Sequence, residues 1–159
     1  MGTNHMGRQS IRFPQPPVVR GFASVAGKKE REGPLGDQFT ATVQDTTFGE
    51  KSWERAERRM QQMTLELALE KAGLTDADLD AAFAGDLLNQ CIGSSFSLRN
   101  RGVPTLGLYG ACSTMAESLL LAAMSVSGGY ARTALAMTSS HFASSERQYR
   151  FPLGYGGQR

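Results

Sequence analysis

The stretch that decides the fold is Pro104-Thr-Leu-Gly-Leu-Tyr-Gly110, followed by Ala111, Cys112 and Ser113-Thr-Met-Ala-Glu-Ser-Leu-Leu-Leu-Ala-Ala-Met-Ser-Val-Ser127. Its first part is a short apolar segment closed by glycine, which is typical of a buried strand. Its last part has the length of a helix and carries one charge, Glu117, in the first turn. A helix that is apolar on every face is expected to be buried, because no side of it suits water. The sequence therefore predicts that Cys112 lies where a strand turns into the N-terminus of a buried helix.

This position of Cys112 suits either chemistry or ligand capture. Partial positive charge at a helix N-terminus stabilises a thiolate. The unpaired N–H groups of the first turn also offer a site to an anion. A small buried hydrophobic residue is the other interpretation of Cys112, and it is the one we adopt for Cys91. Both interpretations of Cys112 stay open on the sequence.

The alternation of strand and helix patterns places the chain in the α/β class. Short connections between such elements give right-handed βαβ units and hence a parallel sheet. The predicted strands are Ala81–Gly85, Thr105–Tyr109 and Thr133–Thr138. Ligands of open parallel sheets collect beyond the carboxyl ends of the strands. Three loops meet that description: Gly85–Gln90, Gly110–Thr114 and Ser139–Glu146.

A long helix is predicted before this sheet. Ser52 is placed to N-cap the helix and Gly73 to end it. Thr75 and Asp78 then have the spacing of a short capping box. We interpret the apolar stripe of this helix as core packing rather than as a cofactor site; it consists of Trp53, Ala56, Met60, Met63 and Leu67.

The N-terminal part is less regular. Residues 1–20 are polar and proline-rich, which predicts a disordered or extended leader. Val18–Val25 is expected to form a first strand. Gly27–Gly36 is rich in turn residues and charges, so we expect a surface loop, with Lys28 and Lys29 on a solvated face.

The bulk composition fits a globular domain with its own core. The 159 residues are 40% apolar and 20% charged, and the net charge of +2 is too small to favour nucleic acid as a partner. Two cysteines without metal-ligand spacing argue against a disulfide scaffold or a zinc site, and a reducing, intracellular compartment is expected. No apolar run reaches the ~18 residues of a membrane-spanning helix.

Nucleophilic catalysis by Cys112 would need a base. His141 follows the strand Thr133–Thr138, so it is expected at the same edge of the sheet as Cys112. A solvated loop histidine is the alternative interpretation. The nucleophile elbow of α/β-hydrolases is a poor match, because Gly110-Ala-Cys-Ser-Thr114 lacks the glycine two residues after the nucleophile.

Gly110-Ala-Cys-Ser-Thr-Met115 at the start of a buried helix is similar to the condensing-enzyme and thiolase superfamily. Several segments in order along the chain resemble, more closely, the stage V sporulation protein AD family of spore-forming bacteria. These are Gly33–Gly36, Trp53–Arg58, Ala84–Gln90, Leu108–Thr114, Thr138–His141, Glu146–Arg150 and Tyr155–Gln158. The resemblance implies a thiolase-like fold, a mixed and mainly parallel sheet around the helix that starts at Cys112. Residues 21–159 would form the first half-domain of its βαβαβαββ repeat, which covers about half the length of that family's protein.

The resemblance also implies a function without catalysis. The family binds dipicolinic acid (pyridine-2,6-dicarboxylate) and works with membrane subunits that move it, with calcium, into the developing spore. The chain would be a peripheral subunit on the spore inner membrane, without a transmembrane segment or a cofactor. A homodimer through the strand at residues 133–138 is expected from the same resemblance.

A flat aromatic dianion needs hydrogen-bond donors, cations and an aromatic wall. We expect N–H donors at the helix start, bidentate arginine contacts and neutral hydrogen bonds from an imidazole and two amides. The predicted ligand-binding residues are Cys112, Ser113, Thr114, His141, Arg147, Arg150, Asn89 and Gln90, with Tyr149 or Phe151 to stack.

Two other hypotheses stay open. In the first, the chain is a condensing enzyme or acyltransferase, in which Cys112 is acylated by coenzyme A or carrier-protein thioesters. In the second, it is a purely structural partner of membrane subunits. An acyl adduct on Cys112 would distinguish the enzyme from both non-catalytic hypotheses.

Overall fold

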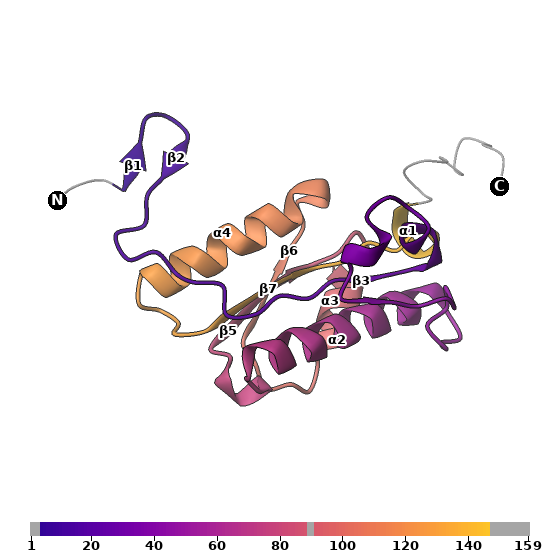
Figure 1. Cartoon of the computed structure of the whole chain (residues 1–159). Helices are drawn as coiled ribbons and strands as arrows, with labels where there is room; N and C mark the ends of the chain where they lie inside the picture. The colour runs from indigo at the N-terminus through magenta and orange to yellow at the C-terminus, as the bar shows by residue number, and fades with distance from the viewer. Residues whose placement is uncertain (1–3, 89–90, 147–159) are drawn as a thin grey trace.

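The computed structural model describes residues 4–88 and 91–146, which form a small parallel sheet between helices (Figure 1). The sheet has three strands: β5 (Ala81–Gly85), β6 (Thr105–Leu108) and β7 (Ala134–Thr138). Helices α2 (Trp53–Ala72) and α3 (Ile92–Leu98) lie on one face, and α4 (Thr114–Ser127) lies on the other. The prediction of an α/β protein is therefore confirmed.

All strand pairs in this sheet are parallel, and the strand order is β6-β5-β7. Phe83 is paired with Leu106 on one side and with Ala136 on the other. β5 is thus the central strand, and its buried stretch Ala82-Phe-Ala-Gly85 suits a strand covered on both faces. The parallel pairing brings the carboxyl ends of all three strands to one edge.

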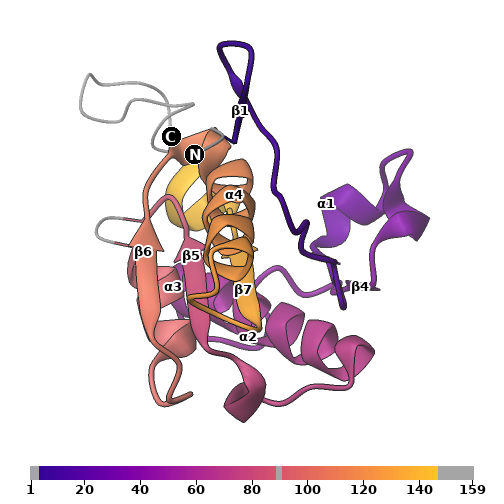
Figure 2. The same cartoon turned by 90° about the vertical axis from the view of Figure 1, so that its left-hand side faces the viewer.

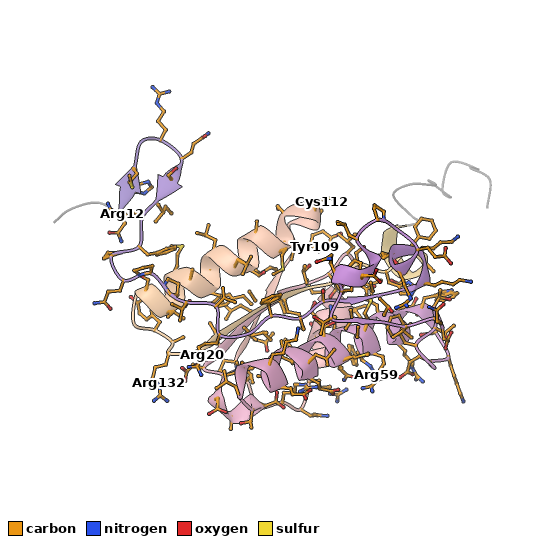
Figure 3. The ribbon with its side chains drawn as sticks, in the orientation of Figure 1. Arg12, Arg20, Arg59, Tyr109, Cys112 and Arg132 are labelled. Carbon is orange, nitrogen blue, oxygen red and sulfur yellow. The ribbon has the colours of Figure 1, made fainter. Side chains whose placement is uncertain are left out.

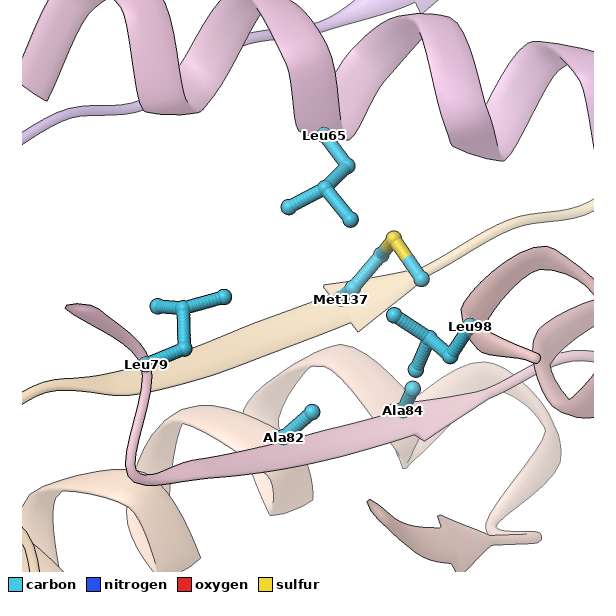
Figure 4. Packing of buried hydrophobic residues seen from close by; sticks show 6 residues of the cluster. All are labelled: Leu65, Leu79, Ala82, Ala84, Leu98 and Met137. Carbon is cyan, nitrogen blue, oxygen red and sulfur yellow. The ribbon is translucent and has the colours of Figure 1, made fainter. Parts of the chain in front are cut away.

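Helix α2 has the predicted bounds and the predicted caps. The Ser52 hydroxyl accepts from the Arg55 N–H at the start, and Gly73 adopts the left-handed conformation (φ 65°) that ends the helix. The capping box of Thr75 and Asp78 is also confirmed. Leu65 packs against the sheet in a core cluster that Figure 4 shows from close by. The cluster consists of Leu65, Leu79, Ala82, Ala84, Leu98 and Met137.

The buried face of α2 differs from the predicted stripe. Ala56 and Met60 are buried as expected, but Met63 and Leu67 are only half-buried. Leu65 fills the core instead. The buried face also includes the polar Glu57 and Gln61, because hydrogen bonds from other elements satisfy them.

Helix α4 is not buried on every face, so that prediction is wrong for the residues described. Its buried positions are Thr114, Ser118 and Ala122, which recur every four residues. These small side chains let the helix approach β5 and β7 closely, so the large side chains point elsewhere. Met115, Leu119, Leu120 and Met124 are between 40% and 48% exposed.

The N-terminal region stands apart from the sheet (Figure 2). A hairpin of β1 (His5–Met6) and β2 (Ser10–Ile11) falls within the predicted leader, and nearly all its side chains are exposed. A first strand over Val18–Val25 is wrong, since only β3 (Val25–Ala26) forms, parallel to β4 (Ala41–Thr42). The expected surface loop contains the short helix α1 (Lys28–Arg31).

Within the described ranges, no helix is both long enough and apolar enough to cross a bilayer.

Candidate functional site

A cavity of about 1300 Å³ opens at the carboxyl edge of the sheet. All three loops predicted for this edge contribute to it, through Leu87, through Ala111 and Cys112, and through Ser139 to Ala143. Two N-terminal segments that the sequence did not indicate complete the wall, residues 23–30 and the region from Thr46 to Trp53. The volume exceeds the 300–1,000 Å³ of most small-molecule sites, so one small aromatic ligand would fill only part of it.

Cys112 lies at the amino end of α4, facing this edge (Figure 3). The chain reaches it through a 3-10 turn, Ala111–Ser113, in which Ala111 has a left-handed φ of 49°. Cys112 is exposed and Cys91 is buried, and both thiols are free. The Cys91 thiol donates to the Leu108 carbonyl, which agrees with its predicted packing role.

The turn is held tightly against β5. Gly85 leaves no room for a side chain, since an added Cβ would overlap the Leu108 carbonyl oxygen and lie 2.5 Å from Thr114 Cγ2. The Thr114 hydroxyl donates to the Ala111 carbonyl and accepts from the Gly110 N–H. Thr114 is therefore a structural residue of the turn, buried beneath the strand.

Two of the backbone donors expected at the helix start, the N–H groups of Ser113 and Thr114, are used within the turn. The Ser113 N–H donates to the Gly110 carbonyl at 3.0 Å, and the Thr114 N–H donates to the Ala111 carbonyl. The Ser113 hydroxyl also donates to Gly110. Of the three predicted residues in this turn, only Cys112 lines the cavity.

His141 lines the same cavity as Cys112, as predicted from its place after β7. Its Nδ1 accepts from the Ala143 N–H, so its Nε2 donates to the Thr46 carbonyl at 2.9 Å. Its ring lies 5.5 Å from the ring of Trp53, centroid to centroid. Trp53, expected in the core, therefore belongs to the wall of the cavity. With both nitrogens bonded to the backbone, His141 is arranged to hold the wall rather than to take a proton from Cys112.

A buried network of polar side chains lies behind this wall. Glu57 accepts hydrogen bonds from the hydroxyls of Ser139 (2.7 Å) and Ser144. Gln61 donates to Ser139 at 2.6 Å and accepts from Ser97 at 2.6 Å. The network joins α2, α3 and the loop after β7. The sequence did not predict it, because buried and exposed polar residues of a helix look alike in the sequence.

Asp86 extends the network to the loop after β5. Its two carboxylate oxygens accept from the Leu88 N–H and from both the N–H and the hydroxyl of Ser94. Asp86 thus caps the start of α3.

Burial raises the pKa of Glu57, since desolvation penalises its charged form and the nearby carboxylate of Asp86 adds to the effect. The hydroxyls of Ser144 and Ser139 and the imidazole of His141 act in the opposite direction. Glu57 is fully buried, so its proton is more tightly held than that of an exposed glutamate.

The cations nearest the cavity were not among the predicted site residues. Lys28 and Lys29 on α1 line it, and both are exposed, as the predicted solvated face requires. Their ion pairs with Glu32 are long, at 4.0 Å and 3.8 Å. Phe39, Phe48 and Phe142 add an aromatic lining next to Trp53. The predicted residues Asn89, Gln90, Arg147, Tyr149, Arg150 and Phe151 lie outside the described residues.

These features define an α/β protein with a candidate ligand site at the carboxyl edge of a parallel sheet, where a thiol, an imidazole and aromatic rings meet. Residues 7–159 match the family model described as Stage V sporulation protein AD (SpoVAD), and the chain belongs to this family.

A curated relative supports the assignment. The chain is 44% identical over 153 residues to a protein named Stage V sporulation protein AD from Bacillus subtilis (strain 168). That alignment covers 96% of this chain and 45% of the relative, so the chain spans about half of the relative's length. The family is named for sporulation, so the assignment supports a role of the chain in that process. The thiolase-like fold stays a prediction.

Proposed function

We propose that the chain binds dipicolinic acid without catalysis, as part of a sporulation channel subunit that moves the acid, with calcium, into the developing spore. One observation carries the proposal. In a chain of this family, the cavity at the carboxyl edge combines an aromatic lining with two lysines. A pyridine dicarboxylate needs both an aromatic wall for its ring and positive charge for its carboxylates.

In this proposal the ring stacks on the aromatic side of the cavity, near Trp53 and Phe48. Lys28 and Lys29 pair with the carboxylates, in addition to Arg147 and Arg150, which remain predicted ligands. Cys112 contributes a polar contact, as a residue retained from an enzyme ancestor. Glu30, which also lines the cavity, would disfavour a dianion near it and so directs the carboxylates toward the lysines.

Titration calorimetry of the intact protein with dipicolinate tests this proposal. We expect binding that weakens about tenfold or more in a Lys28→Ala/Lys29→Ala variant, since hydrogen bonds to charged groups are worth about 1.5–3 kcal/mol each. Arg147→Ala and Arg150→Ala should weaken it as well. The matched control is Lys51→Ala, which removes a lysine that does not line the cavity. No binding by the wild type at millimolar dipicolinate would refute the proposal.

The second candidate is the condensing enzyme or acyltransferase, and the observation in its favour is that Cys112 and His141 line one cavity. Mass spectrometry after incubation with acyl-coenzyme A would then find an adduct that Cys112→Ala abolishes. The backbone hydrogen bonds of both His141 nitrogens favour the non-catalytic proposal. If dipicolinate does not bind and no adduct forms, the third hypothesis, a structural partner of membrane subunits, is favoured.

We also propose that the protein is intracellular, attaches peripherally to the spore inner membrane through the membrane subunits and forms a homodimer along β7. Within the described part of the chain, β7 pairs with β5 alone, so its other edge offers backbone groups to a strand of a second copy. Sedimentation of the intact protein tests the dimer. Ala136→Pro, on the β7 edge, should shift the equilibrium toward monomer.

A further inference from the structure

One face of α2 contacts the segment Ser139–Ser145, which we call the rim segment because its first five residues line the cavity. Trp53, Glu57 and Gln61 follow at intervals of four residues, so they share that face. Trp53 packs against the His141 ring, and Glu57 and Gln61 hydrogen-bond the rim segment. The rim segment is thus attached to the helix along two turns.

Glu57 makes the central attachment. Its two oxygens accept from two different hydroxyls, Ser139 at one end of the rim segment and Ser144 near the other. The side chain is completely inaccessible to solvent. Burying an acidic group costs folding free energy unless hydrogen bonds satisfy it. A buried Glu57 is therefore expected to make a specific structural contribution through its two hydrogen bonds.

We propose that Glu57 is a positioning residue that fastens the rim segment to α2 and thereby fixes the wall of the cavity that carries His141. The part of this inference that concerns a ligand rests on the proposed function. The attachment of the rim segment to α2 is independent of the proposed function, because it follows from the hydrogen bonds alone.

The network is arranged so that a neutral side chain can replace the carboxylate. Ser144 also lies within hydrogen-bond distance of the His141 carbonyl, at 3.0 Å. The Ser144 hydroxyl can therefore donate to that carbonyl while accepting from a protonated Glu57. Glutamine at position 57 would make the same pattern, with its amide donating to Ser144 and its carbonyl accepting from Ser139. Glu57→Gln should preserve the attachment, and Glu57→Ala should abolish it.

Protonation of Glu57 should strengthen the attachment. Two titratable groups face Glu57: the Asp86 carboxylate opposes the ionisation of Glu57, and the His141 imidazole favours it. On the same helix as Glu57, the Arg58 guanidinium instead pairs with the Glu50 carboxylate, with 3.9 Å between nitrogen and oxygen. Burial raises the pKa of Glu57 in the closed state above that of a solvated glutamate, near 4.3. The closed state therefore binds the proton more tightly, and the attachment weakens as the pH rises through the raised pKa.

Hydrogen exchange followed by mass spectrometry tests the attachment without any ligand. In Glu57→Ala, amides of residues 139–145 should exchange about tenfold faster or more, as expected when a buried hydrogen-bonded acidic group is lost. In Glu57→Gln, the amides of residues 139–145 should be protected as well as in the wild type at pH 4, and better than in the wild type as the pH rises. The matched control is Glu54→Ala, an exposed glutamate on the same helix, which should leave the segment unchanged.

Dipicolinate affinity of the intact protein gives the second measurement. We expect about tenfold weaker binding in Glu57→Ala, and binding within about threefold of the wild type in Glu57→Gln and Glu54→Ala. If Glu57→Ala does not fold, Ser144→Ala serves in its place, because it removes one of the two attachments and leaves the carboxyl group hydrogen-bonded to Ser139.

The outcomes separate the two proposals. Faster exchange in Glu57→Ala, together with a wild type that does not bind dipicolinate, would keep the positioning role and overturn the proposed ligand. Unchanged exchange of the rim segment in Glu57→Ala, or in Ser144→Ala where that variant replaces it, would overturn the positioning role whether or not dipicolinate binds. A pH-independent difference between wild type and Glu57→Gln would overturn the role of the proton.

Discussion

Gly85→Ala should destabilise the protein, although it adds a single methyl group. Gly85 ends β5 and is paired with Leu108 and Thr138. The added Cβ would overlap the Leu108 carbonyl oxygen and lie 2.5 Å from Thr114 Cγ2, where carbon atoms prefer about 3.5–4.0 Å. The carbonyl belongs to the backbone of a paired strand and cannot rotate away. Either β6 or the turn before α4 must therefore move.

The size of the effect follows from two opposed contributions. Extra atoms in a close-packed interior cost about 1–3 kcal/mol, and the overlap with backbone places Gly85→Ala at the upper end of that range. Alanine has fewer conformations than glycine in the unfolded chain, and this would recover about 0.4–1 kcal/mol of folding free energy. We expect a net loss of about 2 kcal/mol, or about 4–8 °C in Tm for a chain of this size.

Urea unfolding followed by circular dichroism measures this loss, with Gly107→Ala as the matched control. Gly107 lies in the neighbouring strand, and the nearest atoms to an added Cβ there are those of Cys91 at 3.9 Å. Gly107→Ala should therefore be neutral or slightly stabilising. If Gly85→Ala is as stable as Gly107→Ala, the close contact between β5 and the turn at Cys112 is not as described.

Three further predictions concern the helices. Ser52→Ala should cost about 1 kcal/mol in urea unfolding, because it removes the N-cap of α2. Ala122→Leu should cost about 1–3 kcal/mol through overpacking against the sheet, while Leu119→Ser, at a half-exposed position of α4, should cost less than half as much; the reverse order would contradict the orientation of that helix. Glu57→Gln should gain stability relative to the wild type as the pH rises from 4, since the wild type loses the stabilisation that its raised pKa reflects; equal pH dependence in the two would contradict a buried, titrating Glu57.

The sequence predicted the central elements well because their signals are local. Helix α2 has a capping serine and a terminal glycine, and the strands of the sheet are short apolar runs between turns. Parallel connectivity then follows from the order of the elements, and with it the edge at which the loops meet. Cys112 and His141 were placed at one cavity by this topological argument alone.

The burial of α4 could not be predicted from its mean hydropathy. Apolar side chains are spread around the helix, but the side chains differ in size, and size decides which face approaches a sheet. The small residues Thr114, Ser118 and Ala122 form the contact face, so the leucines and methionines point away from the strands. A large exposed apolar surface of this kind usually marks an interaction site.

The parts of the site that were missed depend on contacts between distant segments. Lys28 and Lys29 line the cavity next to β3, which pairs with β4 across a separation that no periodicity reveals. Glu57 resembles an ordinary solvent-facing glutamate in a charged helix, and its burial depends on hydroxyls more than eighty residues away. Local pattern carries no information about such partners.

Helix α2 links the stability of the fold to the geometry of the cavity. Leu65 anchors the helix to the core, and Trp53, Glu57 and Gln61, one to three turns earlier, hold the rim segment. A substitution in the core that tilts the helix would therefore also displace the His141 wall. A substitution of Glu57 can alter the wall without touching Leu65, because the two side chains lie about two turns apart on the helix. Hydrogen exchange would separate these two routes. Leu65→Ala should speed exchange both in α2 and in residues 139–145, whereas Glu57→Ala should speed it mainly in residues 139–145.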